Sequence, residues 1–218
     1  MKNKNIHNFC AALGFLTAFV LWTIAISLFD VQAIGPSGST VGFATINGFV
    51  HSLTGVHMLL YSITDWLSLV PILFMFGFAL LGFTQWVKRK SIRKVDGSIL
   101  VLGGFYIITF AAYLFFENFV INYRPVRIEG FLEASYPSST TMLVICVMAT
   151  ARMQLHSRIQ NPALRKCVMT MITVFIALMV IGRLISGVHW LTDIIGGALL
   201  SAGLITLYRS VIAFLEGK

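Results

Sequence analysis

The sequence is organised around residues 182–193, which read GRLISGVHWLTD. This stretch separates two long apolar runs, so it predicts a polar turn at a membrane surface. His189 and Asp193 are four residues apart, which places them on one face of a helix, one turn from each other. The Asp193 carboxylate can therefore accept the Nδ1–H of His189 and leave Nε2 free as a nucleophile or base. With Arg183 across a Ser-Gly turn to hold an anionic group, the stretch suits phosphoryl chemistry.

The composition is that of a polytopic membrane protein. Of the 218 residues, 57% are hydrophobic and 11% are charged, whereas soluble domains carry about 25% charged residues. The formal net charge is +8, but the basic residues follow the loops of a membrane topology instead of forming one patch. Nucleic acid is therefore excluded as a partner, and the lipid bilayer is the expected environment.

Six apolar runs predict an all-α bundle of six transmembrane helices in a single domain, residues 1–218. The predicted spans cover residues 9–29, 66–86, 99–116, 138–152, 168–182 and 191–208. Between the first two, residues 41–61 mix apolar side chains with Asn, Ser, Thr and His, which is too polar for a comfortable span. We therefore expect an interfacial or re-entrant helical segment after the first span.

The basic residues predict the orientation of this bundle. With the N-terminus in the cytoplasm, every Lys and Arg except Arg124, Arg127 and Arg183 falls in an inner segment, as the positive-inside rule requires. Both termini are then cytoplasmic, and the three outer arginines have no role in topology, which makes them candidates for function. The compact loops and short tails suit a bacterial plasma membrane.

Three outer segments converge in this topology: Arg124-Pro125, Pro137-Ser138-Ser139-Thr140 and Arg183…His189…Asp193. The second segment reads as a helix start that a serine or threonine caps. Free backbone N–H groups and the positive end of the helix dipole make such a start an anion site. Taken alone, Ser138 is explained equally well as a helix cap with no phosphate-binding role. Arg124 taken alone is most often an interfacial residue whose charged end reaches the membrane surface. Together, the segments predict a phosphate site at the outer surface.

These residues resemble the motifs of the type 2 phosphatidic acid phosphatase (PAP2) superfamily of membrane lipid phosphatases. Its third motif is Ser-Arg-x5-His-x3-Asp, and the stretch from Gly182 to Asp193 matches it, with Gly182 in place of the serine. Arg124-Pro125 match the end of its first motif, Lys-x6-Arg-Pro. Pro137-Ser138 match the start of its second, Pro-Ser-Gly-His. The motif order and the six-span layout also agree, so the resemblance covers essentially the whole chain.

The resemblance implies a hydrolase in which His189 forms a phosphohistidine and Asp193 orients it. The phosphoryl oxygens would be bound by the following residues: Arg124, Arg183, Ser138, Ser139 and Thr140. No cofactor is expected, because arginines and a helix start neutralise the phosphoryl group. No metal is expected either, because His189 and Asp193 lack a third ligand at suitable spacing.

Two departures from the family pattern bear on the chemistry. Glu117 stands at the position of the first-motif lysine, and Arg127 is the candidate to supply the missing cation. Ser139-Thr140 replace the Gly-His of the second motif. In the family that histidine protonates the leaving group, which a threonine hydroxyl cannot do at neutral pH. General acid catalysis is typically worth about 10²–10⁴-fold in rate, so its loss favours a substrate with a good leaving group.

A phosphate monoester expels an alkoxide, comparable to hydroxide, whose parent pKa is near 15.7, and it needs a proton from the enzyme. A diphosphate expels phosphate, whose second pKa is about 6, and needs little help. We therefore expect a polyprenyl diphosphate of the undecaprenyl type as substrate, ahead of phosphatidate. Two alternatives stay open: a lipid phosphotransferase, and a non-catalytic binder or transporter of lipid phosphates. Retention of His189 and Asp193 argues against a dead site, and loss of the Lys and His argues for one.

Overall fold

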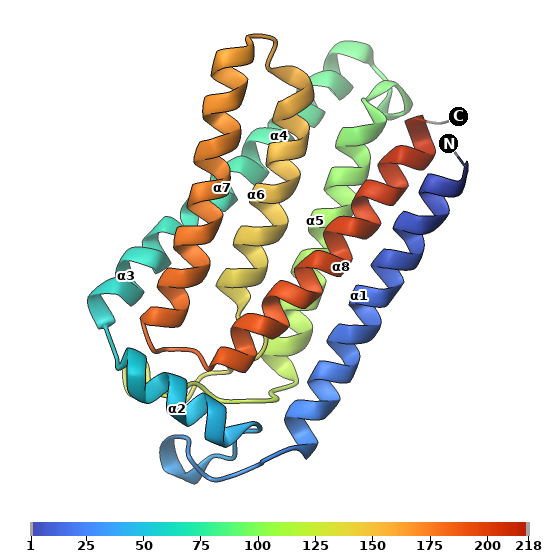
Figure 1. Ribbon diagram of the computed structural model, residues 1–218. Coiled ribbons are helices and arrows are strands. Elements are labelled where there is room, and N and C mark those ends of the chain that lie inside the picture. Colours follow the sequence, from blue (N-terminus) through green and yellow to red (C-terminus); the bar gives the residue numbers. More distant parts are fainter. Residues whose placement is uncertain (1, 217–218) are drawn as a thin grey trace.

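The computed structural model describes residues 2–216 and confirms the all-α fold (Figure 1). Lys218, counted among the inner cations, lies outside the described residues. Eight α-helices follow one another: α1 (Lys2–Leu28), α2 (Ala44–Thr54), α3 (Met58–Leu67), α4 (Leu69–Arg89), α5 (Gly97–Asn118), α6 (Ser139–Arg158), α7 (Pro162–Ile185) and α8 (Leu191–Glu216). Two short 3₁₀ turns, η1 (Pro36–Gly38) and η2 (Ile92–Lys94), lie in the connections.

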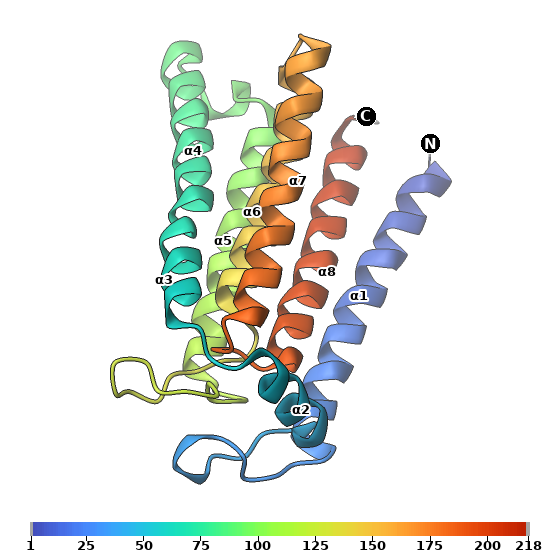
Figure 2. The same cartoon turned by 60° about the vertical axis from the view of Figure 1, so that its left-hand side comes forward.

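The long helices form one bundle, and α2 lies across one end of it (Figures 1 and 2). The connections 119–138 and 186–190 lie at this same end, and both chain ends lie at the other. The side chain of Asn47 ties α2 to the bundle, because its Nδ2 donates to Thr192 Oγ1 (3.0 Å) and its Oδ1 accepts from Thr192 N (3.2 Å). The predicted active segments are therefore gathered at one end, away from the termini.

Five stretches of the described chain are long and apolar enough to cross a membrane: Ile6–Leu28, Met58–Arg89, Gly97–Asn118, Pro162–Ile185 and Leu191–Leu215. The chain is thus a multi-pass membrane protein. Helix α6, the predicted fourth span, does not meet this criterion. It packs against α4, α5, α7 and α8, and ten of its 20 residues are buried. A helix shielded by its neighbours needs no lipophilic surface, so its composition does not decide whether it spans.

The second span begins earlier than predicted. The sequence placed its start at residue 66, but α3 already begins at Met58 and continues into α4 after a break at Ser68. Pro71 explains the break, because it has no N–H to donate to the carbonyl of Leu67 and its ring crowds that carbonyl. The polar segment after the first span is correspondingly shorter than the predicted 41–61, and α2 is its helical part.

The other helices mostly extend beyond their predicted ends, because charged residues ended the hydropathy runs but not the helices. Helix α7 is the clearest case: it was predicted over 168–182 and runs over Pro162–Ile185. Its start is fixed by Asn161, whose Oδ1 accepts from the N–H groups of Ala163 and Leu164, both at 3.0 Å. Proline at the first helical position suits such a start. The extension at the other end places Arg183 inside α7.

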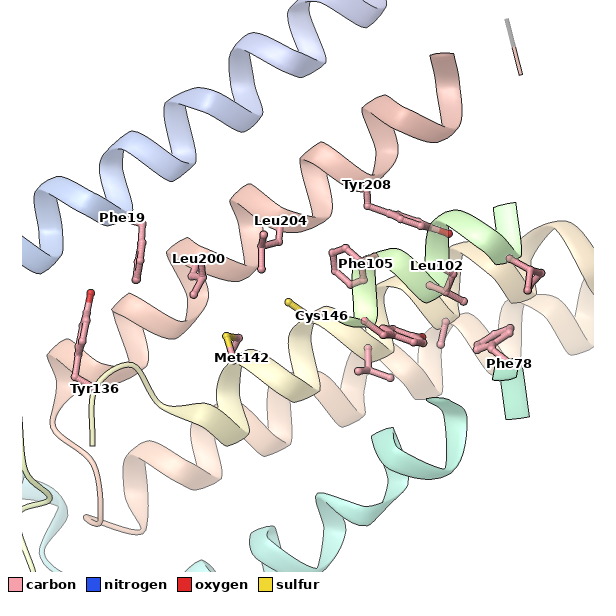
Figure 3. Packing of buried hydrophobic residues seen from close by; sticks show 14 of the residues in the cluster. Phe19, Phe78, Leu102, Phe105, Tyr136, Met142, Cys146, Leu200, Leu204 and Tyr208 are labelled. Carbon is pink, nitrogen blue, oxygen red and sulfur yellow. The ribbon is translucent and has the colours of Figure 1, made fainter. Parts of the chain in front are cut away.

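The main core cluster lies between α1, α4, α5, α6 and α8 (Figure 3). Phe19, Phe105, Met142 and Tyr208 are among its buried members. Tyr136 closes the cluster at the end where the predicted active segments lie, and its ring stacks on Phe19 with centroids 6.2 Å apart. Packing of this kind, not the hydrophobic effect, drives helix association in lipid. It fixes the start of α6 against α8.

Candidate active site

The connection 119–138 folds back on itself and brings distant residues together. Arg124 N donates to Glu133 O (3.1 Å), and Ser135 N donates to Asn122 O (2.9 Å). The reversal is made at Glu129 and Gly130, which both have positive φ (50° and 85°). This hairpin places Asn122, Arg124 and Ser135 beside the turn that carries the catalytic candidates.

The turn between α7 and α8 is fixed by close packing on the connection between α2 and α3. Gly187 has φ 68°, and a Cβ added there would lie 1.8 Å from the carbonyl oxygen of Gly55. His57 N donates to Ser186 O at 3.0 Å. Only glycine fits a position with both a left-handed backbone and such an approach. The turn therefore holds His189 in one orientation.

His189 and Asp193 are linked through Ser135, which the sequence did not predict. Ser135 Oγ donates to Asp193 Oδ2 (2.5 Å) and lies 3.0 Å from His189 Nδ1. The direct distance from His189 Nδ1 to Asp193 Oδ2 is 3.9 Å, so the predicted direct hydrogen bond is wrong. A hydroxyl has a single proton, and Ser135 gives it to Asp193, so it must accept the Nδ1–H of His189. The relay leaves His189 Nε2 unprotonated.

Asp193 is fully buried and receives two further hydrogen bonds. Trp190 N donates to its Oδ2 (2.9 Å) and Asn122 Nδ2 donates to its Oδ1 (3.3 Å). Its backbone carbonyl accepts from Ser138 N (3.0 Å), which joins the start of α8 to the start of α6. A buried carboxylate is tolerated only when its lone pairs are satisfied in this way. Asp193 is thus a fixed anchor for the relay.

The environment keeps His189 neutral. Its side chain is 1% exposed, and its Nε2 has no hydrogen-bond partner among the described residues. Burial lowers the pKa of His189 well below its usual range, and the positive charges of Arg124 and Arg183 lower it further. A neutral imidazole with a free Nε2 lone pair beside two guanidinium groups is arranged for attack on an anionic electrophile.

Arg183 lies in the last turn of α7 and is 1% exposed. Its Nη2 donates to Asp65 Oδ1 (3.0 Å) and to Thr140 Oγ1 (2.6 Å). Its Nη1 lies within hydrogen-bond distance of Thr64 Oγ1 (3.3 Å) and of Tyr61 O (3.4 Å). The guanidinium group is therefore held from α3 and from α6, and its Nε is left without a partner among the described residues.

Arg124 is 9% exposed and is held more loosely. Its Nε lies 3.1 Å from Glu133 Oε2, within ion-pair distance. That contact is not aligned for a hydrogen bond, and neither Nε nor Nη1 has such a partner among the described residues. The ring of Tyr61 lies under both arginines, 4.8 Å from Cζ of Arg183 and 5.8 Å from Cζ of Arg124. The two guanidinium groups thus face one region, and both have buried N–H donors without a hydrogen-bond partner among the described residues.

The α3 side of the site was missed by the sequence analysis. Tyr61, Thr64 and Asp65 all touch Arg183, yet the hydropathy runs assigned them to the polar interfacial or re-entrant segment before the second span. A signal was present: polar residues recur three or four positions apart at His57, Tyr61, Thr64, Asp65 and Ser68. That spacing marks one face of a helix.

The start of α6 behaves as predicted for a capped helix. Ser138 is fully buried and its Oγ accepts from Thr141 N (3.4 Å). The N–H groups of Ser139 and Thr140 open the helix and have no intrahelical acceptor. Thr140, at the position of the second-motif histidine, accepts from Arg183 at the same end. The structure therefore brings Arg124, Arg183, His189 and the α6 start together.

Two sequence candidates lie apart from this cluster. Arg127 is exposed, and its Nη2 donates to Ser37 Oγ in the connection between α1 and α2. Glu117 is exposed near the end of α5 and lines a small cavity with Ser135 and Ser139. The structure thus gives Arg127 another partner and leaves Glu117 at the edge of the site. Among the described residues, no three His, Cys, Asp or Glu side chains are grouped as metal ligands would be.

Comparison with known proteins agrees with this architecture. A family model described as the PAP2 superfamily matches residues 10–215. Among solved structures, the chain is similar to the first transmembrane PAP2 type phosphatidylglycerolphosphate phosphatase from Bacillus subtilis. The TM-score is 0.61, over 93% of this chain and 96% of that chain, and the sequence identity is 17%. At that identity the likeness shows the fold alone. No curated protein sequence matches.

Proposed function

The chain belongs to the PAP2 superfamily, and on that premise we propose that it is a membrane lipid phosphatase. It acts through a phosphohistidine on His189 and prefers a polyprenyl diphosphate. The observation that carries the proposal is the buried Nε2 of His189, which has no partner among the described residues and lies beside two arginines with unused donors. Such a pocket is complementary to an anion that a nitrogen nucleophile can attack.

The terminal phosphoryl group of the substrate binds where the unused donors converge. Arg124 supplies Nε and Nη1, and Arg183 supplies Nε. The N–H groups that open α6 add the positive end of a helix dipole. These cations stabilise the negative charge that spreads over the phosphoryl oxygens in the transition state, without a metal ion.

Two displacements follow. Nε2 of His189 attacks the terminal phosphorus, the N–P bond forms, and the bridging P–O bond breaks to release the lipid monophosphate. Water then attacks the phosphohistidine, the N–P bond breaks, and inorganic phosphate leaves while the proton lost by the water goes to solvent. Throughout, Ser135 and Asp193 hold the Nδ1–H and stabilise the positive charge that develops on the ring.

The leaving group decides the choice of substrate. Thr140 accepts a hydrogen bond from Arg183 at 2.6 Å and so supports that arginine. It does not replace a general acid, because a threonine hydroxyl is too weak an acid to give up its proton at neutral pH. A lipid monophosphate leaves from a diphosphate with a second pKa of about 6 and needs no proton from the enzyme. An alkoxide leaving from phosphatidate needs one. The proposal therefore favours diphosphates.

The membrane orientation is part of the proposal. The loops that carry the site lie at the opposite end of the bundle from both chain ends (Figure 1). Most basic residues lie toward the chain-end face, which the positive-inside rule assigns to the cytoplasm. The site then faces the extracytoplasmic side of what we infer to be a bacterial plasma membrane. A lipid reaches it with its headgroup at that surface.

The test is phosphate release by the purified protein in detergent, with and without a chelator. A long prenyl diphosphate and phosphatidate are compared, with His189→Ala as the variant and His156→Ala, exposed near the other end of the bundle, as its matched control. We expect chelator-resistant release that favours the diphosphate and falls at least about 10⁴-fold in His189→Ala, the scale on which loss of a nucleophile acts.

Comparable turnover of the two lipids would overturn the diphosphate preference. Release that survives in His189→Ala would overturn the phosphohistidine. Binding of lipid phosphate with no release from either substrate would point to a transferase or a binder, and addition of candidate acceptor alcohols would separate those two.

A further inference from the structure

Tyr61 of α3 lies against both arginines of the site. Its ring centroid is 4.8 Å from Cζ of Arg183 and 5.8 Å from Cζ of Arg124. The face of an aromatic ring carries the negative part of its quadrupole and attracts a cation within about 6 Å. One ring therefore attracts two cations that come from different segments, α7 and the hairpin in the connection 119–138.

The backbone of Tyr61 is fixed against α7. Its carbonyl oxygen accepts from Thr64 Oγ1 (2.9 Å) and lies 3.4 Å from Arg183 Nη1. The two helices approach closely at this level, because a Cβ added at the buried Gly182 would lie 2.9 Å from Cγ2 of Thr64. Glycine at this position leaves room for that approach. The ring of Tyr61 is thus attached to the helical bundle and does not depend on the hairpin for its place.

The carboxylate beside Arg124, by contrast, belongs to the same segment as Arg124 itself. Glu133 Oε2 lies 3.1 Å from Arg124 Nε, and both residues are part of the hairpin. This pair can hold the side chain within the hairpin, but it does not tie Arg124 to the bundle. Two guanidinium groups also repel each other. An attraction from the bundle offsets that repulsion, and the ring of Tyr61 is placed to supply it.

An aromatic face is suited to this task because it attracts the charge without accepting a particular N–H group. Arg124 keeps Nε and Nη1, and Arg183 keeps Nε, without hydrogen-bond partners among the described residues. A carboxylate in place of the ring would accept from these donors and would compete with a phosphoryl group for them. The ring therefore keeps Arg124 near the site and leaves its donors free.

We propose that Tyr61 is a positioning residue, whose ring holds Arg124 beside Arg183 so that both guanidinium groups face one phosphoryl group. The inference rests on the proposed function for the identity of that group. The hydroxyl of Tyr61 has no part in it, because phenylalanine carries the same negative ring face. Tyr61→Phe should therefore retain the role, and Tyr61→Leu, which has no aromatic face, should lose it.

The test is steady-state kinetics with a long prenyl diphosphate in lipid nanodiscs. Tyr61→Leu should raise KM about three- to tenfold, the range that a cation–π contact covers. It should leave kcat within about twofold, because Arg183 has hydrogen-bond partners on α3 and α6 besides the ring. Tyr61→Phe should match the wild type within about twofold in both constants. The matched control is Trp66→Leu, which removes a 74% exposed aromatic ring from the same helix and should change neither constant.

A double-mutant cycle tests whether Tyr61 acts through Arg124. In the Arg124→Gln background the ring has no cation from the hairpin to hold, so Tyr61→Leu should raise KM by at most about twofold more. Fully additive losses would mean that the effect of the ring does not pass through Arg124, and they would overturn the proposal. A loss of kcat in Tyr61→Phe would also overturn it, because the hydroxyl would then take part in the chemistry.

Binding of inorganic phosphate, read from the rise in melting temperature, lets this proposal and the proposed function fail separately. We expect Tyr61→Leu to bind phosphate at least about threefold more weakly than the wild type and Tyr61→Phe do. That dependence without phosphate release from the prenyl diphosphate would contradict the proposed function and keep the role of Tyr61. Equal binding by all three proteins would overturn the role of Tyr61 alone. A wild type that neither binds nor releases phosphate would overturn both.

Discussion

The two arginines of the site are held in opposite ways. Arg183 is 1% exposed and is fixed from α3 and α6 before any substrate arrives, through Asp65, Thr140 and Thr64. Arg124 comes from a hairpin, has one carboxylate at ion-pair distance, and keeps two nitrogen atoms without hydrogen-bond partners among the described residues. Rotamer freedom of a long side chain is costly to remove at binding, so Arg183 is preorganised and Arg124 is not.

The difference suggests a division of labour. A preorganised donor stabilises the transition state without a cost at the moment of reaction. A loosely held cation is free to follow the substrate and contributes to binding. Arg183 should therefore affect kcat most, and Arg124 should affect KM most.

Replacement of each arginine by lysine should give the largest effect. Arg183→Lys should lower kcat/KM by about 10²–10³-fold, mainly through kcat, because an ammonium group cannot reproduce the fork that binds several partners. Arg124→Lys should lower it by about tenfold, mainly through KM. Steady-state kinetics with a long prenyl diphosphate measure both, and melting temperatures control for folding. Equal losses, or a larger loss for Arg124→Lys, would break the contrast.

The relay on the other side of His189 should give the next largest effect. Ser135→Ala removes the acceptor of Nδ1–H and one donor to Asp193, so kcat should fall about 10–100-fold while KM stays within about twofold. Asp193→Asn should cost far less in the Ser135→Ala background than in the wild type, because the two residues act as a unit. Additive losses would mean that Asp193 reaches His189 without Ser135.

The dependence of activity on pH reports the pKa of His189, which burial and the positive charges of the two arginines lower. His189 reacts as the neutral imidazole, and its pKa lies below the ordinary value of 6.5 because of burial, then Arg124, then Arg183. Activity should therefore be constant above pH 6.5 and fall about tenfold per unit once the pH drops below the folded-state pKa. The free energy of unfolding should also fall in acid. As the pH drops through 6.5 the unfolded chain takes up a proton on His189, whereas the folded chain does so only at a lower pH.

Removal of either positive charge should raise the pKa of His189 and move this acid limb to higher pH. Arg124→Gln should move it further than Arg183→Gln, since Arg124 has the larger electrostatic effect on His189. The profile of kcat/KM against pH gives both shifts. A larger shift for Arg183→Gln would show that the fixed arginine also dominates the electrostatics.

The sequence predicted the parts of the site that depend on local spacing. Arg183, His189 and Asp193 lie on one turn, and Ser138 caps the helix that it was predicted to cap. The partners that join these parts were not predictable in the same way. Ser135 reaches His189 because backbone hydrogen bonds of Arg124 and Asn122 fix the register of the hairpin in the connection 119–138. Spacing along the chain does not encode that register.

The second miss has a different cause. Hydropathy alone placed the start of the second span at residue 66, because the face of α3 that meets Arg183 is polar. A window that averages over all faces of a helix removes such a stripe, whereas helical periodicity retains it. Arg127 stays a prediction: its position in the chain suggested phosphate binding, and in the structure its side chain donates to Ser37.

The smallest effect should come from the carboxylate beside Arg124. The side chain of Glu133 is 38% exposed, and exposed ion pairs are worth about 0–1 kcal/mol. Because 1.4 kcal/mol corresponds to a tenfold change, Glu133→Gln should lower KM by at most about fivefold. Asp65→Asn is the matched variant on Arg183. It should leave KM within about twofold, because the amide oxygen still accepts from Arg183, which Thr64 and Thr140 also hold. A larger decrease in KM for Asp65→Asn than for Glu133→Gln would reverse the contrast. It would mean that the carboxylate of Asp65 restrains Arg183 more than the carboxylate of Glu133 restrains Arg124.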